Sequence, residues 1–161
     1  MLERLSATPL GRSGLLAGKA MAYSVISLAQ VILLVIISLA LSWHPHGSGL
    51  AWLPTLVSVV LAMMTFGLAA LAMAGSLKAE VTLGLANLVY IVGLVAGAVV
   101  WPLVDYPKAI RPVIAALPTT ALGESLRAWG VGYTLWWPLA SLAGWAILLG
   151  LLARKVFTWI S

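Results

Sequence analysis

Three long uncharged runs constrain this chain more than any other feature of its sequence. No Asp, Glu, Lys or Arg occurs in residues 20–77, 81–104 or 128–153. A helix needs about 20 apolar residues to cross the hydrocarbon core of a bilayer, so the second and third runs each accommodate one span and the first accommodates two. Only 8% of the 161 residues are charged, against about a quarter in soluble domains. The sequence therefore predicts an all-α polytopic membrane protein.

Breaks within these runs set the expected span boundaries. The segment Trp43-His44-Pro45-His46-Gly47 interrupts the first run, Gly75-Ser76 precedes a short polar turn, and Pro102 begins a polar cluster. These signals divide the chain into a polar segment, residues 1–19, and a transmembrane domain, residues 20–161. The expected spans are residues 20–42, 50–74, 81–103 and 132–156.

The basic residues beside the spans predict the orientation. With the start of the chain in the cytoplasm, the inner side holds Arg4, Arg12, Lys19, Lys78, Arg154 and Lys155, and the outer side holds only Lys108, Arg111 and Arg127. Cytoplasmic flanks of membrane spans are enriched in Lys and Arg. We therefore expect a multi-pass protein of a bacterial-type cytoplasmic membrane with both termini inside.

Residues 109–130 are too polar and too interrupted to form a fifth span. Two short apolar patches flank Pro118-Thr119-Thr120, and Thr120 is a candidate N-cap for a helix that carries Glu124 in its first turns. Glu124 and Arg127 are three residues apart and are expected to pair on one helix face. We predict two short helices that form a hairpin re-entering the outer leaflet; the alternative is an amphipathic loop on the membrane surface.

The opening segment resembles a phosphate-binding loop only superficially. Its Gly18-Lys19 pair lacks the earlier glycine and the following Ser or Thr of that motif, since Ser13 and Ala20 stand there. The net charge of +5 comes from basic residues spread thinly between apolar spans, which is typical of topology signals and not of a nucleic-acid interface. Nucleotide and nucleic-acid binding by this chain are therefore not expected.

No arrangement of residues predicts catalysis. His44 and His46 flank a proline in a loop, and two imidazoles fall short of an ordinary metal site. Asp105 and Glu124 are expected to pair with Lys108 and Arg127 at the surface instead of forming an acid–base pair. The chain has no cysteine, so disulfide and thiol chemistry are absent.

A few polar residues and glycine motifs lie within the apolar runs. Amides are costly at membrane depth unless they face protein or a cavity, so Gln30, Asn87 and Tyr90 are candidate path-lining residues. Interhelical hydrogen bonding is the alternative role. The pairs Gly93/Gly97 and Ala140/Gly144 form small-xxx-small motifs, which allow close approach of two backbones within the subunit or across a dimer.

The interiors of the spans contain no acid, base or histidine. Ion-coupled transporters usually need such groups inside the membrane. The energy for transport must then come from another subunit, or transport is passive.

The order of four sequence segments resembles the membrane subunit of type-2 ABC exporters, the daunorubicin-resistance-like permeases. These segments are LERLSATPLGRSGLLAGK, a Gln-containing span, IAALPTTALGESLRA and a last span ending in ARKVFTW. The resemblance implies that this chain supplies the last four of six helices. It also implies that the other two come from an upstream extension or a separate polypeptide.

The same resemblance implies functional roles for particular residues. Residues 1–19 would contact an ABC ATPase subunit through Leu2, Glu3, Arg4, Leu5 and Arg12, with ATP and magnesium bound in that partner and no cofactor here. The alternative for this segment is a basic anchor that binds lipid headgroups. The outer hairpin would act as a gate through Pro118, Thr120, Glu124 and Arg127.

The expected function is therefore that of a non-catalytic permease subunit of an ATP-driven exporter that moves a hydrophobic or amphiphilic substrate such as a drug, lipid or glycolipid. It would work as a homodimer or with a second permease half. The alternative is a stand-alone membrane scaffold that acts through helix–helix contacts.

Overall fold

The computed structural model describes residues 11–46, 50 and 52–156, and these residues form helices and no strand. The chain divides into two units, residues 1–44 and 45–161. Four helices are long and apolar enough to cross a membrane: Met21–Ala40, Trp52–Ser76, Ala79–Ala96 and Trp137–Lys155. The predicted all-α polytopic fold is confirmed.

The first unit contains one long helix, α2 (Gly11–Ala40). It begins well before the expected span at residue 20, because hydropathy marks a membrane boundary whereas a helix continues until a residue breaks it. Its 30 residues correspond to a length of about 45 Å. Ser42, with φ of 65°, turns the chain out of the helix after Ala40.

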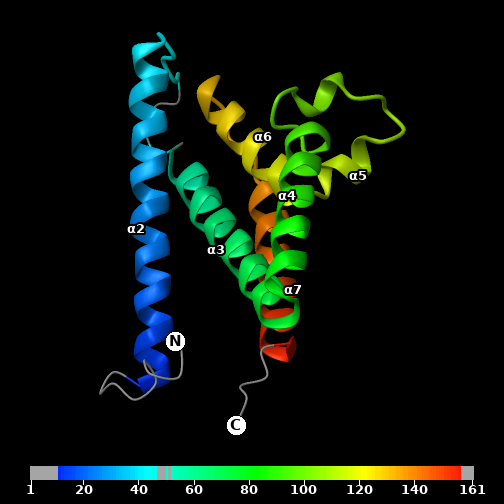
Figure 1. Ribbon diagram of the computed structural model, residues 1–161. Helices are drawn as coiled ribbons and strands as arrows, with labels where there is room; N and C mark the ends of the chain where they lie inside the picture. The colour runs from blue at the N-terminus through cyan, green and yellow to red at the C-terminus, as the bar shows by residue number, and fades with distance from the viewer. Residues whose placement is uncertain (1–10, 47–49, 51, 157–161) are drawn as a thin grey trace. The chain divides into compact units, whose positions relative to one another are not determined.

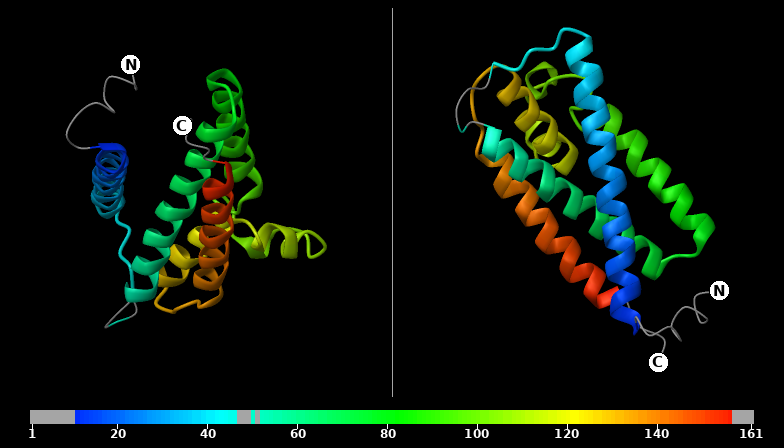
Figure 2. Two further views of the ribbon diagram at one scale, coloured as in Figure 1. Left: turned by 90° about the horizontal axis from the view of Figure 1, so that it is seen from below. Right: turned by 90° about the vertical axis from the view of Figure 1, so that its left-hand side faces the viewer.

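The second unit contains three long helices and a short helical hairpin (Figures 1 and 2). The long helices are α3 (Trp52–Ser76), α4 (Ala79–Ala96) and α7 (Trp137–Val156). Between α4 and α7 lie a 3-10 turn, η2 (Leu103–Asp105), and the short helices α5 (Arg111–Ala115) and α6 (Pro118–Gly130). Helix α3 packs against α7 and α6, and α6 packs against α7.

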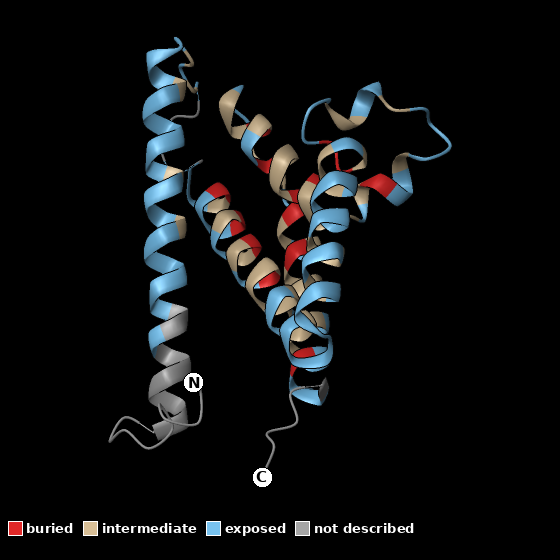
Figure 3. Ribbon diagram, in the orientation of Figure 1, coloured by how far each residue is buried: buried red, intermediate tan, exposed pale blue. Residues whose placement is uncertain are grey.

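Buried residues gather where α3, α6 and α7 meet, and they are mostly small (Figure 3). The buried face of α3 consists of Thr55, Ser58, Ala62 and Thr65. Small residues let membrane helices approach closely, and short hydroxyl side chains add hydrogen bonds between them. By contrast, no residue of α4 is buried. The turn that follows α4 contains the buried Ala98.

Two of the helices differ in extent from the expected spans. Helix α4 ends at Ala96, not at residue 103, because Ala98 adopts a left-handed conformation with φ of 51°. Helix α7 begins at Trp137, not at residue 132. The preceding residues form a turn around Gly132 (φ 90°), and Pro138 suits the first turn of a helix.

Candidate functional site

The tip of the α5–α6 hairpin is held by α7 on one side. The indole Nε1 of Trp145 donates a hydrogen bond of 2.7 Å to the carbonyl oxygen of Ala116, in the turn between α5 and α6. Trp145 lies in the middle of α7 and not at one of its ends. The hydrogen bond therefore fixes the tip at the level of the middle of this apolar helix.

The end of α4 contacts the same hairpin tip. A Cβ added at Gly93 would lie 3.2 Å from Cγ2 of Thr119, and one at Gly97 would overlap the Thr119 side chain. The small-xxx-small motif predicted at these two glycines thus receives the first turn of α6 within the subunit. Around the corresponding position at Gly144 no heavy atom lies within 4 Å, so the second motif has no such contact inside the described part of the chain.

A short seam of hydroxyl groups joins α6 to α3 and α3 to α7. Ser125 Oγ donates to Ser58 Oγ at 3.0 Å, and Ser58 Oγ donates to the carbonyl oxygen of Pro54 at 3.0 Å. Thr65 Oγ1 lies 2.8 Å from the carbonyl oxygen of Leu61 and 3.3 Å from that of Leu142. These bonds satisfy polar groups that would be costly to leave unpaired away from water.

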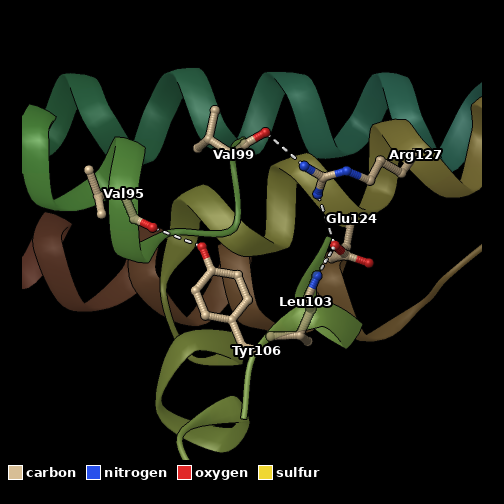
Figure 4. Close-up of polar contacts among 6 residues, drawn as sticks. All are labelled: Val95, Val99, Leu103, Tyr106, Glu124 and Arg127. Carbon is tan, nitrogen blue, oxygen red and sulfur yellow. Dashed lines mark hydrogen bonds and ion pairs between the residues drawn. The ribbon is translucent and has the colours of Figure 1, made fainter. Parts of the chain in front are cut away.

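Glu124 and Arg127 connect α6 to the segment after α4 (Figure 4). Arg127 Nη1 lies 2.9 Å from Glu124 Oε1, and this is the one ion pair among the described residues. The same Glu124 oxygen accepts the backbone N–H of Leu103 at 3.0 Å, and Arg127 Nη2 donates to the carbonyl oxygen of Val99 at 2.7 Å. The pairing predicted from the spacing is confirmed, and it extends to two backbone groups about 20 or more residues earlier in the chain.

Further hydrogen bonds hold the segment between α4 and α5. Tyr106 donates its hydroxyl proton to the carbonyl oxygen of Val95 at 2.8 Å, and Arg111 Nε donates to the carbonyl oxygen of Tyr106 at 2.7 Å. Arg111 Nη2 also donates to the carbonyl oxygen of Val104. Residues 95–111 are thereby held as one hydrogen-bonded cover beside the hairpin, which we call the α4–α5 cover.

Thr120 does not cap a helix as predicted. Helix α6 begins two residues earlier, at Pro118, with Leu117 as its N-cap residue, because proline is preorganised for the first helical position and has no N–H to satisfy. Thr120 is instead fully buried, and its Oγ1 has no hydrogen-bond partner. Its position in the first turn places it beside the Thr119 contact with α4.

The three candidate path residues are all exposed. Gln30 on α2, and Asn87 and Tyr90 on α4, are exposed in the chain taken alone, and 67% of Tyr90 is accessible. Asn87 and Tyr90 share a helix with Gly93 and Gly97 but do not join the hairpin contact. The structure thus groups the gate candidates Pro118, Thr120, Glu124 and Arg127 on one helix, and places the path candidates elsewhere.

The predicted coupling residues Leu2, Glu3, Arg4 and Leu5 lie outside the described residues. Arg12 lies in the first turn of α2. The basic residue and the candidate span 21–40 are therefore parts of one continuous helix.

The sequence contained only weak signals for the contacts that position the hairpin. Trp145 stands out as a tryptophan in the middle of a span, far from the interfaces that tryptophan usually prefers. His46 is exposed, and its backbone N–H donates to the carbonyl oxygen of Gly130 at 3.1 Å. No sequence pattern pairs His46 with a residue so distant in the chain.

Four apolar helices, a small-residue seam where α3, α6 and α7 meet and a polar hairpin against the middle of α7 define a polytopic α-helical integral membrane protein. Its sequence matches the profile described as ABC-2 family transporter protein over residues 1–155. The chain belongs to this family. It is a membrane permease subunit of an ABC transporter. Permeases of this family associate with an ABC ATPase subunit. No curated protein and no solved structure matches the chain in the same comparisons.

Proposed function

We propose that this permease subunit moves a hydrophobic or amphiphilic substrate out of the cell, and that the α5–α6 hairpin is its outer gate. The observation that carries the gate is the hydrogen bond between Trp145 and Ala116. Residues 145 and 154 are separated by about 14 Å along α7, roughly half of a hydrocarbon core of about 30 Å. With Arg154 at the inner surface, the hairpin tip reaches close to the bilayer midplane.

A re-entrant hairpin of this kind needs partners for its backbone. Irregular backbone at membrane depth is tolerated only where protein or a water-filled cavity surrounds it. The tip has such partners: Trp145 on α7 and the glycines of α4. These contacts support a re-entrant hairpin over an amphipathic loop on the membrane surface.

The energy for transport would come from the ATPase subunit. The interiors of the four candidate spans contain no Asp, Glu, Lys, Arg or His, the groups that ion-coupled transporters use inside the membrane. ATP would close the ATPase subunits, which would displace residues 1–19 and tilt the first span. The α5–α6 hairpin would then open the path toward the outside.

The exposed polar residues of the spans suggest where the path runs. An amide that faces lipid is costly, and interhelical or aqueous partners remove that cost. Because Gln30, Asn87 and Tyr90 have exposed side chains in the isolated chain, we assign each of them to a surface that a second copy or a second permease half completes. Amide groups among apolar side chains suit an amphiphilic substrate.

Cysteine labelling tests the proposed orientation directly. The chain contains no cysteine, so single substitutions at the exposed positions Lys78 and Lys108 give clean reporters. We expect an impermeant maleimide to label Lys108→Cys in intact cells and Lys78→Cys only after permeabilisation. The reverse pattern would place the hairpin in the cytoplasm and remove it as an outer gate.

Reconstitution tests the transport function. The permease and its ATPase, in vesicles that contain a fluorescent amphiphile, should extrude the probe with ATP and not with ADP. Trp145→Phe, which removes the indole donor to Ala116, should increase leak without ATP, whereas Trp136→Phe, at an exposed position, should behave as the parent protein. If tagged permease never co-purifies with an ATPase, a membrane scaffold is the better description.

A further inference from the structure

The chain between α2 and α3 has a fixed point at His46. Its backbone N–H donates to the carbonyl oxygen of Gly130 at 3.1 Å, and its Nδ1 lies 3.4 Å from the same oxygen. Gly130 is the last residue of α6. The chain leaving the first span is therefore fastened to the C-terminal end of the proposed gate helix.

The end of α6 is shaped to accept this contact. The N–H groups of Val131, Gly132 and Tyr133 bond to the carbonyl oxygens of Arg127, Trp129 and Ala128, respectively. These bonds satisfy the preceding carbonyls of the last turn and leave that of Gly130 for His46. Carbonyl groups at a helix end have no intrahelical partner, so an N–H from elsewhere stabilises the terminus.

Gly132, in the turn after α6, lies next to His46. Its φ of 90° is one that L side chains rarely adopt. A Cβ at this position would lie 3.4 Å from the carbonyl oxygen of His46 and 3.6 Å from its Cβ. The turn after α6, whose conformation requires glycine at residue 132, thus lies against the backbone of His46.

The connection from α2 to this fixed point is short. The N–H groups of Leu41, Ser42 and Trp43 bond back to the carbonyl oxygens of Ile37, Leu39 and Ser38, respectively, so the end of α2 is closed as far as Trp43. The connection from residue 43 to residue 46 spans at most about 11 Å when it is fully extended. A displacement of the end of α2 that stretches this connection to its full length therefore pulls on His46.

We propose that His46 is a positioning residue that transmits movement of the first span to the outer gate. Tilting of α2 by the ATPase would pull the segment 43–46, and the bond to Gly130 would carry the C-terminal end of α6 with it. This inference rests on the proposed ATP-driven gating and adds its mechanical connection. The contacts of α6 with α3 and α7 would then guide the movement of the gate helix, and the pull through His46 would cause it.

Lengthening the connection between α2 and His46 tests this proposal. In the permease–ATPase complex, Leu126→Cys on the exposed side of α6 reports the accessibility of the gate to a maleimide with and without ATP. A Gly-Ser-Gly-Ser insertion between His44 and Pro45 lengthens the connection, and the same insertion after Gly47 lies beyond the fixed point as a matched control. We expect the first insertion to abolish the ATP-dependent change in labelling rate and the second to preserve it, with ATP hydrolysis retained in both.

A second variant tests the hydrogen bond itself. His46→Pro removes the N–H donor while keeping the chain length, and the ATP-dependent change in labelling should fall roughly fivefold, the factor that corresponds to one exposed hydrogen bond. His46→Ala, which keeps the N–H, should retain most of the change.

The outcomes separate this proposal from the function on which it rests. If the parent complex shows no ATP-dependent change in labelling, the gate assignment fails, and the connection fails with it. If the parent responds and the insertion before Pro45 responds equally, the gate is driven through other contacts and His46 does not transmit the movement. Loss of the response in both insertion variants would also overturn the proposal, since the effect would then not depend on where the chain is lengthened.

Discussion

Helices α3 and α4 are adjacent in the chain and both are apolar enough to span a membrane, but they are packed in opposite ways. Helix α3 buries Thr55, Ser58, Ala62 and Thr65 against α6 and α7. Helix α4 buries no residue, and the glycines at its C-terminal end, Gly93 and Gly97, lie close to Thr119 of the hairpin. Apolarity places both helices in the bilayer, whereas small and hydroxyl side chains decide which of them packs within this subunit.

The comparison divides α4 into two parts with different partners. Gly93 and Gly97 approach Thr119 closely, whereas no heavy atom lies within 4 Å of a Cβ added at Gly84. The first part completes the packing of this chain. The second, which carries Asn87, has no buried residue, and it is the part that we propose to contact another subunit.

The largest expected effect comes from substitution of the packed glycine. Gly97→Ala places a methyl group where the Thr119 side chain and the carbonyl oxygen of Gly93 already lie, and overpacking of this kind costs about 3 kcal/mol. Gly84→Ala is the matched control on the same helix and should raise stability by up to about 1 kcal/mol, since alanine favours helix. Equilibrium unfolding in mixed micelles measures both; equal effects would mean that α4 does not pack on the hairpin tip.

The next effect concerns the ion pair that holds the α4–α5 cover. Glu124→Ala leaves Arg127 and the N–H of Leu103 without their carboxylate partner. The expected loss is about 2 kcal/mol, most of it from the group left unsatisfied, because the pair itself is partly exposed. Glu80→Ala, at the exposed start of α4, should change stability by only about 0.5 kcal/mol.

Protease sensitivity gives an independent readout of the same substitution. Loss of the Glu124 contacts should release residues 97–110 and increase cleavage within them. An intact cover in Glu124→Ala would show that Tyr106 and Arg111 hold this segment without the ion pair.

The sequence predicted the spans because charge is excluded from a bilayer core, and the hairpin because proline and charge divide residues 109–130. It did not predict the end of α4, since the residues after Ala96 are as apolar as those before it, and their sequence reveals neither the positive φ of Ala98 nor the contact of Gly97 with Thr119. Thr120 was misassigned because two hydroxyl residues follow Pro118, and the proline itself sets the helix start. The position of His46 depends on the positive φ of Gly132 and on a hydrogen bond to Gly130, a residue far away in the chain. No local sequence pattern encodes either feature.

A smaller effect is expected at the hydroxyl seam of α3. Ser125→Ala removes the donor to Ser58 at a buried site, and hydrogen bonds between membrane helices contribute about 0.6 kcal/mol on average. A double-mutant cycle with Ser58→Ala isolates the pair from the loss of each hydroxyl alone. A coupling energy near zero would show that small size, and not hydrogen bonding, selects serine here.

The exposed part of α4 should show no effect on the stability of the isolated subunit. Asn87→Leu replaces an exposed amide with a side chain that is favourable in lipid, so the unfolding free energy of the monomer should be unchanged or slightly higher. If this face meets a second subunit or the path, as proposed, the same variant should weaken association or lower ATP-dependent transport. Leu88→Ala, at an exposed neighbouring position, controls for a general change in the helix surface. Unchanged assembly and transport in Asn87→Leu would return α4 to the lipid and leave α3, α6 and α7 as the functional part of the subunit.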